Sequence, residues 1–538
     1  MAMTDSTHSI IRSASRFFSG TMLSRMTGMV RDISMAFAFG TQASVAAFLV
    51  AFRFSHLLRR LLGEGALQSA FIPQFEKIRH QEPQRAAAFF RSLTAALSIL
   101  LSFIVIITMT LLWGVLIWAN LEEGNAEIIQ LTLLMMPSLI FICLYGINAS
   151  LLQCEKSFFT ASVAPVAFNL LWIVGILSLK HLPSKEAMRG LTVFVNLACL
   201  AQWAVTLHQT KKCLRALGKN LANPLKNIFS HDIASLLAPL SLGIIGVGAS
   251  QINNALDAVF ARYADAAGPA YLWYAMRLQQ LPLALFSLAI AAATLPPLAR
   301  AIKNGDNKQF SNFLDFSLRK SVALMLPISA AIFALGASSI TLIYGHGGFD
   351  QQAVANTTLC LWAYGLGLFP MSIVLILVPA FYAQGNYKIP TQISIASILL
   401  NLILNFVLVF VFEKGAACVA LATSISAWMN MFLLLSKLEE KSSYALSPKL
   451  KAGIWKVSCV SLLAMLASAA FSYYWLAEGS WILWKKGIMP LGPRGSLQQL
   501  GLLALQAFIF LFSLLGASYM LQVDDILKIH TSESPLDL

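Results

Sequence analysis

Long apolar runs follow one another along almost the whole chain, from Ser15 to Val523, and they constrain the fold more than any other feature. A run of about 17–25 apolar residues is long enough to cross a bilayer as a helix. These runs lack the alternation of barrel strands, so their backbone polar groups must be satisfied within helices. Only 12% of the residues are charged, against about 25% in a typical soluble domain. The sequence therefore predicts an all-α polytopic membrane protein.

Length and apolarity predict about fourteen membrane spans. The first carries arginines and lacks the small-residue cleavage site of a signal peptide, so we expect the N-terminus to be retained. The predicted spans are Arg16–Gly40, Ser44–Phe75, Ala88–Trp118, Ile128–Gln153, Phe158–Leu179, Arg189–Leu207, Ile233–Tyr263, Ala270–Arg300, Leu314–Tyr344, Ala353–Ala383, Pro390–Phe412, Gly415–Leu435, Gly453–Leu476 and Leu497–Gln522.

Lys and Arg residues concentrate in alternate connections between these spans. Cytoplasmic loops carry such an excess, so we predict that these connections and both termini are cytoplasmic. The same rule accounts for most of the net charge of +14, and no nucleic-acid partner is expected. The basic connections are Lys77–Arg85, Lys211–Lys226, Arg300–Lys320 and Lys437–Lys456. One connection on the opposite side, Trp484–Gly495, is also basic and departs from the rule.

A short internal repeat indicates two related halves. The run AAFLVAFRF, which contains Arg53, resembles PAYLWYAMRL, which contains Arg277, and Pro73 and Pro297 have the same separation of 224 positions. Transporters are often built from such repeats, although a chance match between two apolar helices is the alternative. The predicted divisions are a first lobe at 1–208, a cytoplasmic linker at 209–232, a second lobe at 233–440, and two further spans with the tail at 441–538.

Charged residues cluster between Arg25 and Glu64, in sequence that otherwise suits a bilayer. A charged side chain at bilayer depth costs about 3 kcal/mol on insertion scales, so such residues usually face a cavity. With a rise of about 1.5 Å per residue, Arg25, Arg59 and Arg60 are expected to converge in the inner half of the membrane. The alternative is structural, because Arg60 and Glu64 are four residues apart and could neutralise each other.

Arginine has a planar fork of donors that suits bidentate binding of phosphate, so this cluster is a candidate site for a pyrophosphate. Arg31 is turned about 120° from the helix face that Arg25 and Asp32 share, and it could serve packing instead. The chain has no P-loop, nucleophile elbow, zinc-binding HExxH or paired catalytic carboxylates, and its seven cysteines form no CxxC pair. We therefore predict a transporter and not an enzyme.

A second polar group occurs in later spans. Asp257 follows three amide residues in an otherwise apolar span, and Asn401, Asn405 and Thr423 lie in two further spans. Oxygen ligands of this kind could hold a small cation. Hydrogen bonding between helices is the alternative, and it is the commoner use of amides in membrane spans.

The run SRMTGMVRD (Ser24–Asp32), followed by AFLVAFRFSHLLRRLLGEGALQSAFIPQF (Ala47–Phe75), resembles the signature of the MurJ/MviN lipid II flippases of the MOP exporter superfamily. Further similarity lies in SQIN, WYAMRL, LPPLAR and AFYAQGNYKIPT, so it covers most of the chain. The resemblance implies fourteen helices in two six-helix lobes around a central cationic cavity, with the last two helices forming a groove for a polyprenyl tail. It also implies alternating access that carries lipid II from the cytoplasmic to the outer leaflet of the bacterial inner membrane.

The resemblance also assigns residues. The family's cavity arginines fall on Arg25, Arg31, Arg59, Arg60 and Arg277, with Glu64 as their acidic partner. The sodium site of sodium-coupled members falls on Asp257, Asn401, Asn405, Thr423 and the Val419 carbonyl. The chain departs from the family pattern at Ala46 and Met276, where acidic residues are common, and at Asn405, where the sodium pattern has an aspartate. Fewer charges are thus left for a cation, and the membrane potential is the alternative driving force.

The expected partners are lipid II, the bilayer and proteins of cell-wall synthesis, and the chain is expected to be a monomer that requires no cofactor. Two alternatives stay open, an exporter of another polyprenyl-pyrophosphate-linked glycan and a MATE-like small-molecule exporter. A drug exporter would need acidic residues in its cavity, whereas arginines are predicted here. A membrane glycosyltransferase is disfavoured, because no outer loop is long or acidic enough for a catalytic site.

Overall fold

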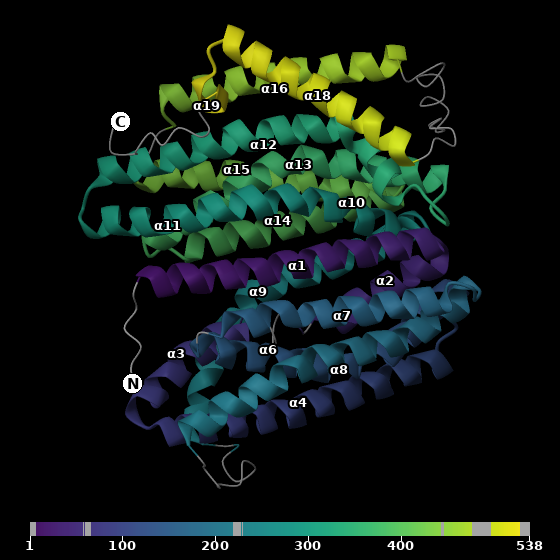
Figure 1. The fold of residues 1–538 in the computed structure, drawn as a ribbon, viewed down its shortest axis with the longest axis vertical. Coiled ribbons are helices and arrows are strands. Elements are labelled where there is room, and N and C mark those ends of the chain that lie inside the picture. The colour runs from purple at the N-terminus through teal and green to yellow at the C-terminus, as the bar shows by residue number, and fades with distance from the viewer. Residues whose placement is uncertain are drawn as a thin grey trace. The chain divides into compact units, whose positions relative to one another are not determined.

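Helices make up nearly all of the part of the chain that the structure describes, and no strand occurs in that part (Figure 1). This computed structural model describes residues 7–57, 59, 66–155, 157–218, 228, 230–442, 446–475 and 496–527. The chain divides into two units, Met1–Ala258 and Val259–Leu538. The predicted all-α fold is confirmed, whereas the predicted lobe boundaries stay a prediction.

In the first unit, helix α1 packs on α7, α7 packs on α8, and α6 also packs on α8. Helix α2 packs on α5. The helices are α1 (Thr7–Phe39), α2 (Ala43–Ser55), α3 (Ala66–Gln81), α4 (Pro83–Trp118), α5 (Glu123–Met135), α6 (Ser138–Cys154), α7 (Phe158–Leu179) and α8 (Ser184–Leu217). Helix α9 (His231–Ala264) begins in the first unit and ends in the second.

In the second unit, α13 packs between α12 and α15, and α16 packs on α12 and α18. The elements are α10 (Gly268–Pro282), η3 (Leu283–Ser287), α11 (Leu288–Lys303), α12 (Asn307–Tyr344), α13 (Gln351–Ala383), α14 (Lys388–Phe406), η4 (Val407–Val411), α15 (Ala417–Ser442), α16 (Pro448–Trp475), α18 (Ser496–Met520) and α19 (Asp524–Leu527). The elements η3 and η4 are single π-helical turns that continue α10 and α14.

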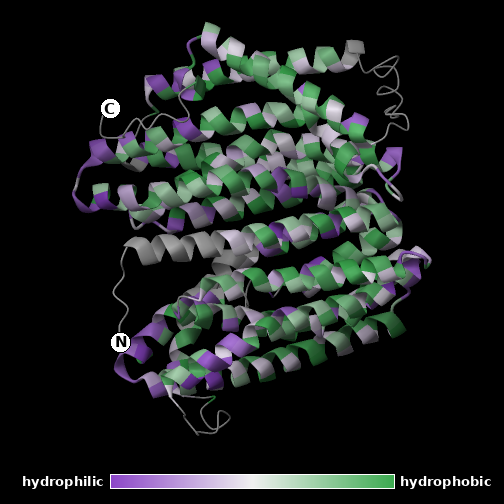
Figure 2. Ribbon diagram, viewed as in Figure 1, coloured by the Kyte–Doolittle hydropathy of each residue, from purple (hydrophilic) through white to green (hydrophobic). Residues whose placement is uncertain are grey.

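Ten helices in the described part of the chain are long and apolar enough to cross a membrane, and a bent pair would make eleven. Each predicted span falls on one helix or on consecutive helices. The count of fourteen crossings stays a prediction, because length and apolarity support fewer. Figure 2 shows hydrophobic residues along the helices and hydrophilic residues at connections such as the turn between α11 and α12, which belongs to a predicted cytoplasmic loop.

Several predicted spans contain breaks of the helical ladder, and two of these breaks lie beside prolines. The span predicted at Ile128–Gln153 is two helices, α5 and α6, bent by 47°. Pro137 lies between them and has no N–H group with which to continue the ladder. In the span predicted at Ala270–Arg300, the π-helical turn η3 follows directly after Pro282. The predicted span Ser44–Phe75 is longer than a bilayer core requires, which predicts a bend at the glycines at positions 63 and 65, and these glycines lie outside the described residues.

Prolines inside other helices leave backbone carbonyls that side chains of neighbouring helices satisfy. Pro165 in α7 cannot donate to the carbonyl four residues earlier, Ala161 O, which accepts instead from the hydroxyl of Tyr145 on α6 at 2.8 Å. Pro370 in α13 likewise frees Leu366 O, which accepts from Nε1 of Trp428 on α15 at 2.9 Å. These bonds fix helix pairs at points where each helix could otherwise bend.

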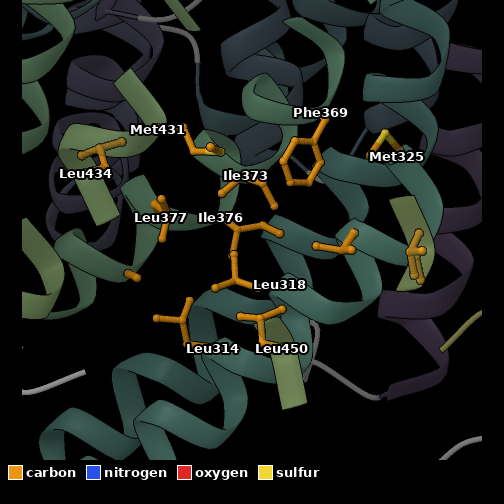
Figure 3. Packing of buried hydrophobic residues seen from close by; sticks show 14 of the residues in the cluster. Leu314, Leu318, Met325, Phe369, Ile373, Ile376, Leu377, Met431, Leu434 and Leu450 are labelled. Atoms are coloured by element: carbon orange, nitrogen blue, oxygen red, sulfur yellow. The ribbon is translucent and has the colours of Figure 1, made fainter. Parts of the chain in front are cut away.

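The apolar core of the second unit lies between α12, α13, α15 and α16. Figure 3 shows the side chains that fill it, including Leu318, Ile376 and Leu434, each at most 2% exposed. In the most apolar window of α13, 56% of the residues are buried, against only 11% in α4 and 17% in α18. Helix α13 is therefore central in its unit, whereas α4 and α18 present most of their apolar surface outward, as lipid-facing helices do.

Candidate substrate site

Arg31 is buried in the first unit, where it forms an ion pair with Asp32. The two residues are 7% and 4% exposed. The Nη2 and Nε atoms of Arg31 donate to Asp32 Oδ1 at 2.7 and 3.1 Å, and Nη1 donates to Asn169 Oδ1 at 3.0 Å. The guanidinium carbon also lies 4.7 Å from the ring centroid of Trp172, within the range of a cation–π interaction. All three nitrogens of Arg31 therefore have protein partners.

Asn169 on α7 connects this ion pair to the rest of α1. Its Nδ2 donates to Ser24 O and to Thr27 Oγ1, both at 3.1 Å, while its Oδ1 accepts from Arg31. Positions 24, 27 and 31 have i, i+3, i+7 spacing and so share one face of α1. One asparagine thus fastens almost two turns of α1 to α7.

Arg25 lies within the same two turns but is exposed. It follows Ser24 directly, so its side chain is turned about 100° away from the face that contacts Asn169. The two arginines of α1 therefore differ in environment, because Arg31 is enclosed by protein groups and Arg25 is accessible. The convergence of Arg25 with Arg59 and Arg60 stays a prediction.

An aromatic group lies between α2 and α7 and consists of Phe48, Phe52, Phe168 and Trp172. Phe52 is 4.9 Å from Trp172 between ring centroids, and Phe48 and Phe168 lie 5.6 and 5.5 Å from it. Trp172 is only 2% exposed. Because the same indole lies under Arg31, the aromatic group connects the buried ion pair to the end of α2.

Arg59 follows α2 and is half-buried. Its backbone N–H donates to His56 O at 3.1 Å, which begins a new turn directly after the helix. Arg60 and Glu64 lie outside the described residues, and so does their predicted ion pair.

Arg277 is half-buried on α10, in the second unit. Its guanidinium carbon lies 4.3 Å from the ring centroid of Trp273. Two residues further on, the buried Gln279 uses Nε2 to donate to Tyr364 O at 3.4 Å, which attaches α10 to α13 close to Arg277. The structure therefore provides Arg277 with a stacking surface on its own helix and a firm attachment of that helix to its neighbour.

The polar residues predicted in the second unit lie together and form what we term the amide chain. Asn405 Nδ2 donates to Asn401 Oδ1 at 3.0 Å, Asn401 Nδ2 donates to Thr423 Oγ1 at 3.3 Å, and Thr423 Oγ1 donates to Val419 O at 3.0 Å. Asn401 and Asn405 are 2% and 0% exposed. The chain of bonds runs from α14 to α15.

Some of the oxygens that a cation could use are engaged in hydrogen bonds within the amide chain. Three oxygens that a cation would need, on Asn401, Thr423 and Val419, already accept hydrogen bonds within the group. Such bonding is typical of amides that hold membrane helices together. Asp257, the one predicted ligand with a carboxylate, is 2% exposed and belongs to the first unit. The described residues contain no cluster of three or more His, Cys, Asp or Glu side chains that could hold a metal. Sodium coupling stays a prediction.

Three side chains that contact or precede the arginines were not predicted from the sequence, namely Asn169, Trp172 and His56. A polar residue within the otherwise apolar span at Phe158–Leu179 was a usable signal for Asn169, because polar groups in lipid need partners. Trp172 lies three residues later, on the same helix face. His56 lies three residues before Arg59, although nothing in the sequence indicates which helix its ring contacts.

Guanidinium groups inside long apolar helices define a polytopic helical membrane protein with a charged site within its spans. The family model for the lipid II flippase MurJ matches residues 35–492. The chain therefore belongs to the MurJ family of lipid II flippases.

Curated relatives agree with this assignment over nearly the whole chain. The probable lipid II flippase MurJ of Chlamydia muridarum (strain MoPn / Nigg) is 32% identical over 535 residues, which cover 98% of this chain and 97% of the relative. The lipid II flippase MurJ of Burkholderia cenocepacia is 29% identical and covers 80% of this chain and 83% of its own length.

Solved structures show the same fold. The structure described as "Lipid II flippase MurJ, inward closed conformation" has a TM-score of 0.73 at 23% identity, and the match covers 94% of this chain and 99% of that one. An inward-facing multidrug resistance MATE family transporter of the MOP superfamily has a TM-score of 0.63 at 15% identity, covering 82% and 99%. The fold is thus shared with a lipid II flippase and with a multidrug resistance transporter.

Proposed function

We propose that this protein is a lipid II flippase, which moves the undecaprenyl-pyrophosphate-linked peptidoglycan precursor from the cytoplasmic to the outer leaflet by alternating access. The observation that carries the proposal is the family match over residues 35–492 in a chain that places Arg25, Arg59 and Arg277 in membrane-spanning sequence. Guanidinium groups bind phosphate through paired, charge-assisted hydrogen bonds. A drug exporter for cations would need acidic groups at these positions.

In this mechanism, Arg25, Arg59, Arg60 and Arg277 bind the pyrophosphate and the sugar-peptide headgroup. Glu64 balances part of their charge, and Arg31 holds α1 in place through Asp32 and Asn169. An anion that leaves a negative-inside cell gains about 2.3 kcal/mol per charge for each 100 mV of membrane potential. The potential can therefore favour export without a coupled ion, in keeping with the hydrogen-bonded state of the amide chain.

The same proposal places the protein as a monomer in the bacterial inner membrane, with both termini in the cytoplasm. Its partners are lipid II, the surrounding bilayer and proteins of cell-wall synthesis. The basic connections that precede α4 and α12 support this orientation, because cytoplasmic loops collect Lys and Arg.

The test is a lipid II translocation assay with purified protein in liposomes under an imposed potential. The double variant Arg59→Glu/Arg60→Glu is expected to abolish translocation while still inserting into the membrane. Lys449→Glu/Lys451→Glu is the matched control, since it makes the same change of charge at exposed residues of α16 and should translocate normally. Normal translocation by the first variant would exclude the arginine site.

Native mass spectrometry of the purified protein separates lipid II from other cargo of the same class. Retention of lipid II is the expected result. Retention of a different polyprenyl-pyrophosphate glycan would instead identify an exporter of that glycan.

A further inference from the structure

His56 occupies the junction between α2 and Arg59. It is the C-cap of α2, where its backbone N–H donates to Phe52 O at 3.1 Å. Its own carbonyl accepts from the N–H of Arg59, also at 3.1 Å. The direction in which the chain leaves α2 toward Arg59 therefore depends on how His56 is held.

The side chain of His56 is held on three sides. Its ring stacks on Phe52 at a centroid distance of 4.1 Å, and Nδ1 lies 3.1 Å from Phe52 O. Its Nε2 lies 3.8 Å from the Sγ atom of Cys199 on α8. With 9% of its surface exposed, the ring is enclosed by α2 and α8.

These distances assign the hydrogen bonds of the ring. A carbonyl oxygen can only accept, so Nδ1 carries the proton and donates to Phe52 O. In the neutral ring, Nε2 then presents a lone pair, to which the thiol of Cys199 donates. The orientation of the imidazole thus depends on a donor at position 199.

Arg59 follows His56 by three residues and is half-buried. Its backbone N–H donates to His56 O at 3.1 Å, so the course of its main chain depends on the residue that caps α2. Phe52, on which His56 stacks, also packs on Trp172 under Arg31. These contacts therefore connect the position of Arg59 to the buried ion pair of Arg31 and Asp32 on α1.

We infer that His56, oriented by the thiol of Cys199, is a positioning residue that fixes Arg59 for binding the pyrophosphate of the substrate. This inference rests on the proposed function, because Arg59 is assigned there as a ligand of the headgroup. His56 makes no contact with substrate and acts through its backbone bond to Arg59 and its bonds to Phe52 and Cys199.

The first test is a double-mutant cycle on the affinity for lipid II, measured by native mass spectrometry of the full-length protein. His56→Leu replaces the imidazole with an apolar side chain and removes both ring hydrogen bonds. It is expected to weaken binding about tenfold, within the range of couplings between contacting residues. In an Arg59→Ala background, the same change should weaken binding less than about twofold, because the residue through which it acts is gone. Equal losses in both backgrounds would show a general structural role and overturn the inference.

Cys199 offers a conservative rescue. Cys199→Ala removes the donor to Nε2 and should weaken binding in the same direction as His56→Leu, whereas Cys199→Ser keeps a donor and should bind like the native protein. Cys360→Ala is the matched control, because Cys360 is a buried thiol at 1% exposure in the second unit. Equal binding by the alanine and serine variants at position 199 would contradict the assigned hydrogen bond.

A second measurement needs no lipid and separates this inference from the proposed function. Phenylglyoxal modifies accessible guanidinium groups, and peptide mass spectrometry reports the rate at each arginine. The rate at Arg59 should change in His56→Leu, while the rate at Arg85 on α4 stays constant as an internal reference. An unchanged rate at Arg59 would overturn the positioning role. A changed rate in a protein that fails to bind lipid II would support the positioning role and reject the proposed function.

Discussion

Removing the carboxylate of Asp32 tests the buried anchor of α1 directly. In Asp32→Asn, the side chain keeps its size and loses its charge, so the guanidinium of Arg31 stays enclosed without its counter-charge. The two charge-assisted bonds from Arg31 to Asp32 Oδ1, at 2.7 and 3.1 Å, are weakened together. Breaking a buried ion pair by removing one partner costs about 3–5 kcal/mol, because an uncompensated charge is left behind.

The first unit contains a matched control in the pair of Arg85 and Asp232. Arg85 donates to both carboxylate oxygens, at 2.9 and 3.0 Å, but its side chain is 49% exposed, against 9% for Arg31. Ion pairs in contact with water contribute only about 0–1 kcal/mol. Asp232→Asn should therefore change stability little, although the chemical change is identical.

The assay is thermal unfolding of the purified protein in detergent, followed by intrinsic fluorescence. At about 2 °C per kcal/mol for a large domain, the expected loss of about 3–5 kcal/mol lowers the unfolding temperature of Asp32→Asn by roughly 6–10 °C. The unfolding temperature of Asp232→Asn should fall by about 2 °C or less. The double variant Arg31→Gln/Asp32→Asn carries no unpaired charge at this site. It should recover more than half of the drop in unfolding temperature that Asp32→Asn causes. Equal shifts for the two single variants would refute the reasoning, since burial would then have no effect.

Gly367→Ala should destabilise the packing of α13 on α15 by about 1–3 kcal/mol, because its Cβ would lie 2.9 Å from Ser424 Cα; an unchanged unfolding temperature would contradict that close approach. Tyr145→Phe keeps the ring but leaves Ala161 O without its donor, so we expect a loss of about 1–3 kcal/mol and faster amide hydrogen exchange around the middle of α7; unchanged exchange would mean that the bond does not brace that helix. Replacing sodium with choline at a constant membrane potential should leave lipid II translocation within about twofold of its rate, because the oxygens of Asn401, Thr423 and Val419 already accept hydrogen bonds; loss of translocation would establish sodium coupling.

Composition and hydropathy were sufficient to predict the helical membrane fold, because apolar runs of spanning length have few other solutions. They did not locate the breaks within the spans. The bend between α5 and α6 coincides with Pro137, so residue chemistry contained a signal that length alone does not use. The end of α2 at Ser55 has no such local signal. The side chain of its capping residue, His56, contacts Cys199, which lies 143 residues away in the sequence. Contacts between distant residues cannot be derived from local patterns.

In the candidate site, too, local features could be predicted from the sequence, whereas contacts between distant residues could not. A helical wheel indicated that Arg31 is turned away from Arg25, and the structure places Arg31 in a buried ion pair and Arg25 at an exposed position. The partner Asn169 could not be predicted from spacing, because it lies 138 residues from Arg31. The amide chain was predicted as a set of residues, while its internal hydrogen bonding required the packing of α14 on α15.

The two arginines of α1 differ in how far protein groups engage their guanidinium groups. Three of the five N–H groups of the Arg31 guanidinium donate to Asp32 and Asn169, whereas Arg25 is exposed. The burial of Arg31 is instead compatible with a rigid α1–α7 pair, in which Asn169 fixes the turns that carry Arg25. Trp172 and Phe52 extend this attachment to His56 and so to Arg59. We therefore expect substitution of the buried Arg31 to lower the unfolding temperature as well as transport, and substitution of the exposed Arg25 to leave the unfolding temperature unchanged.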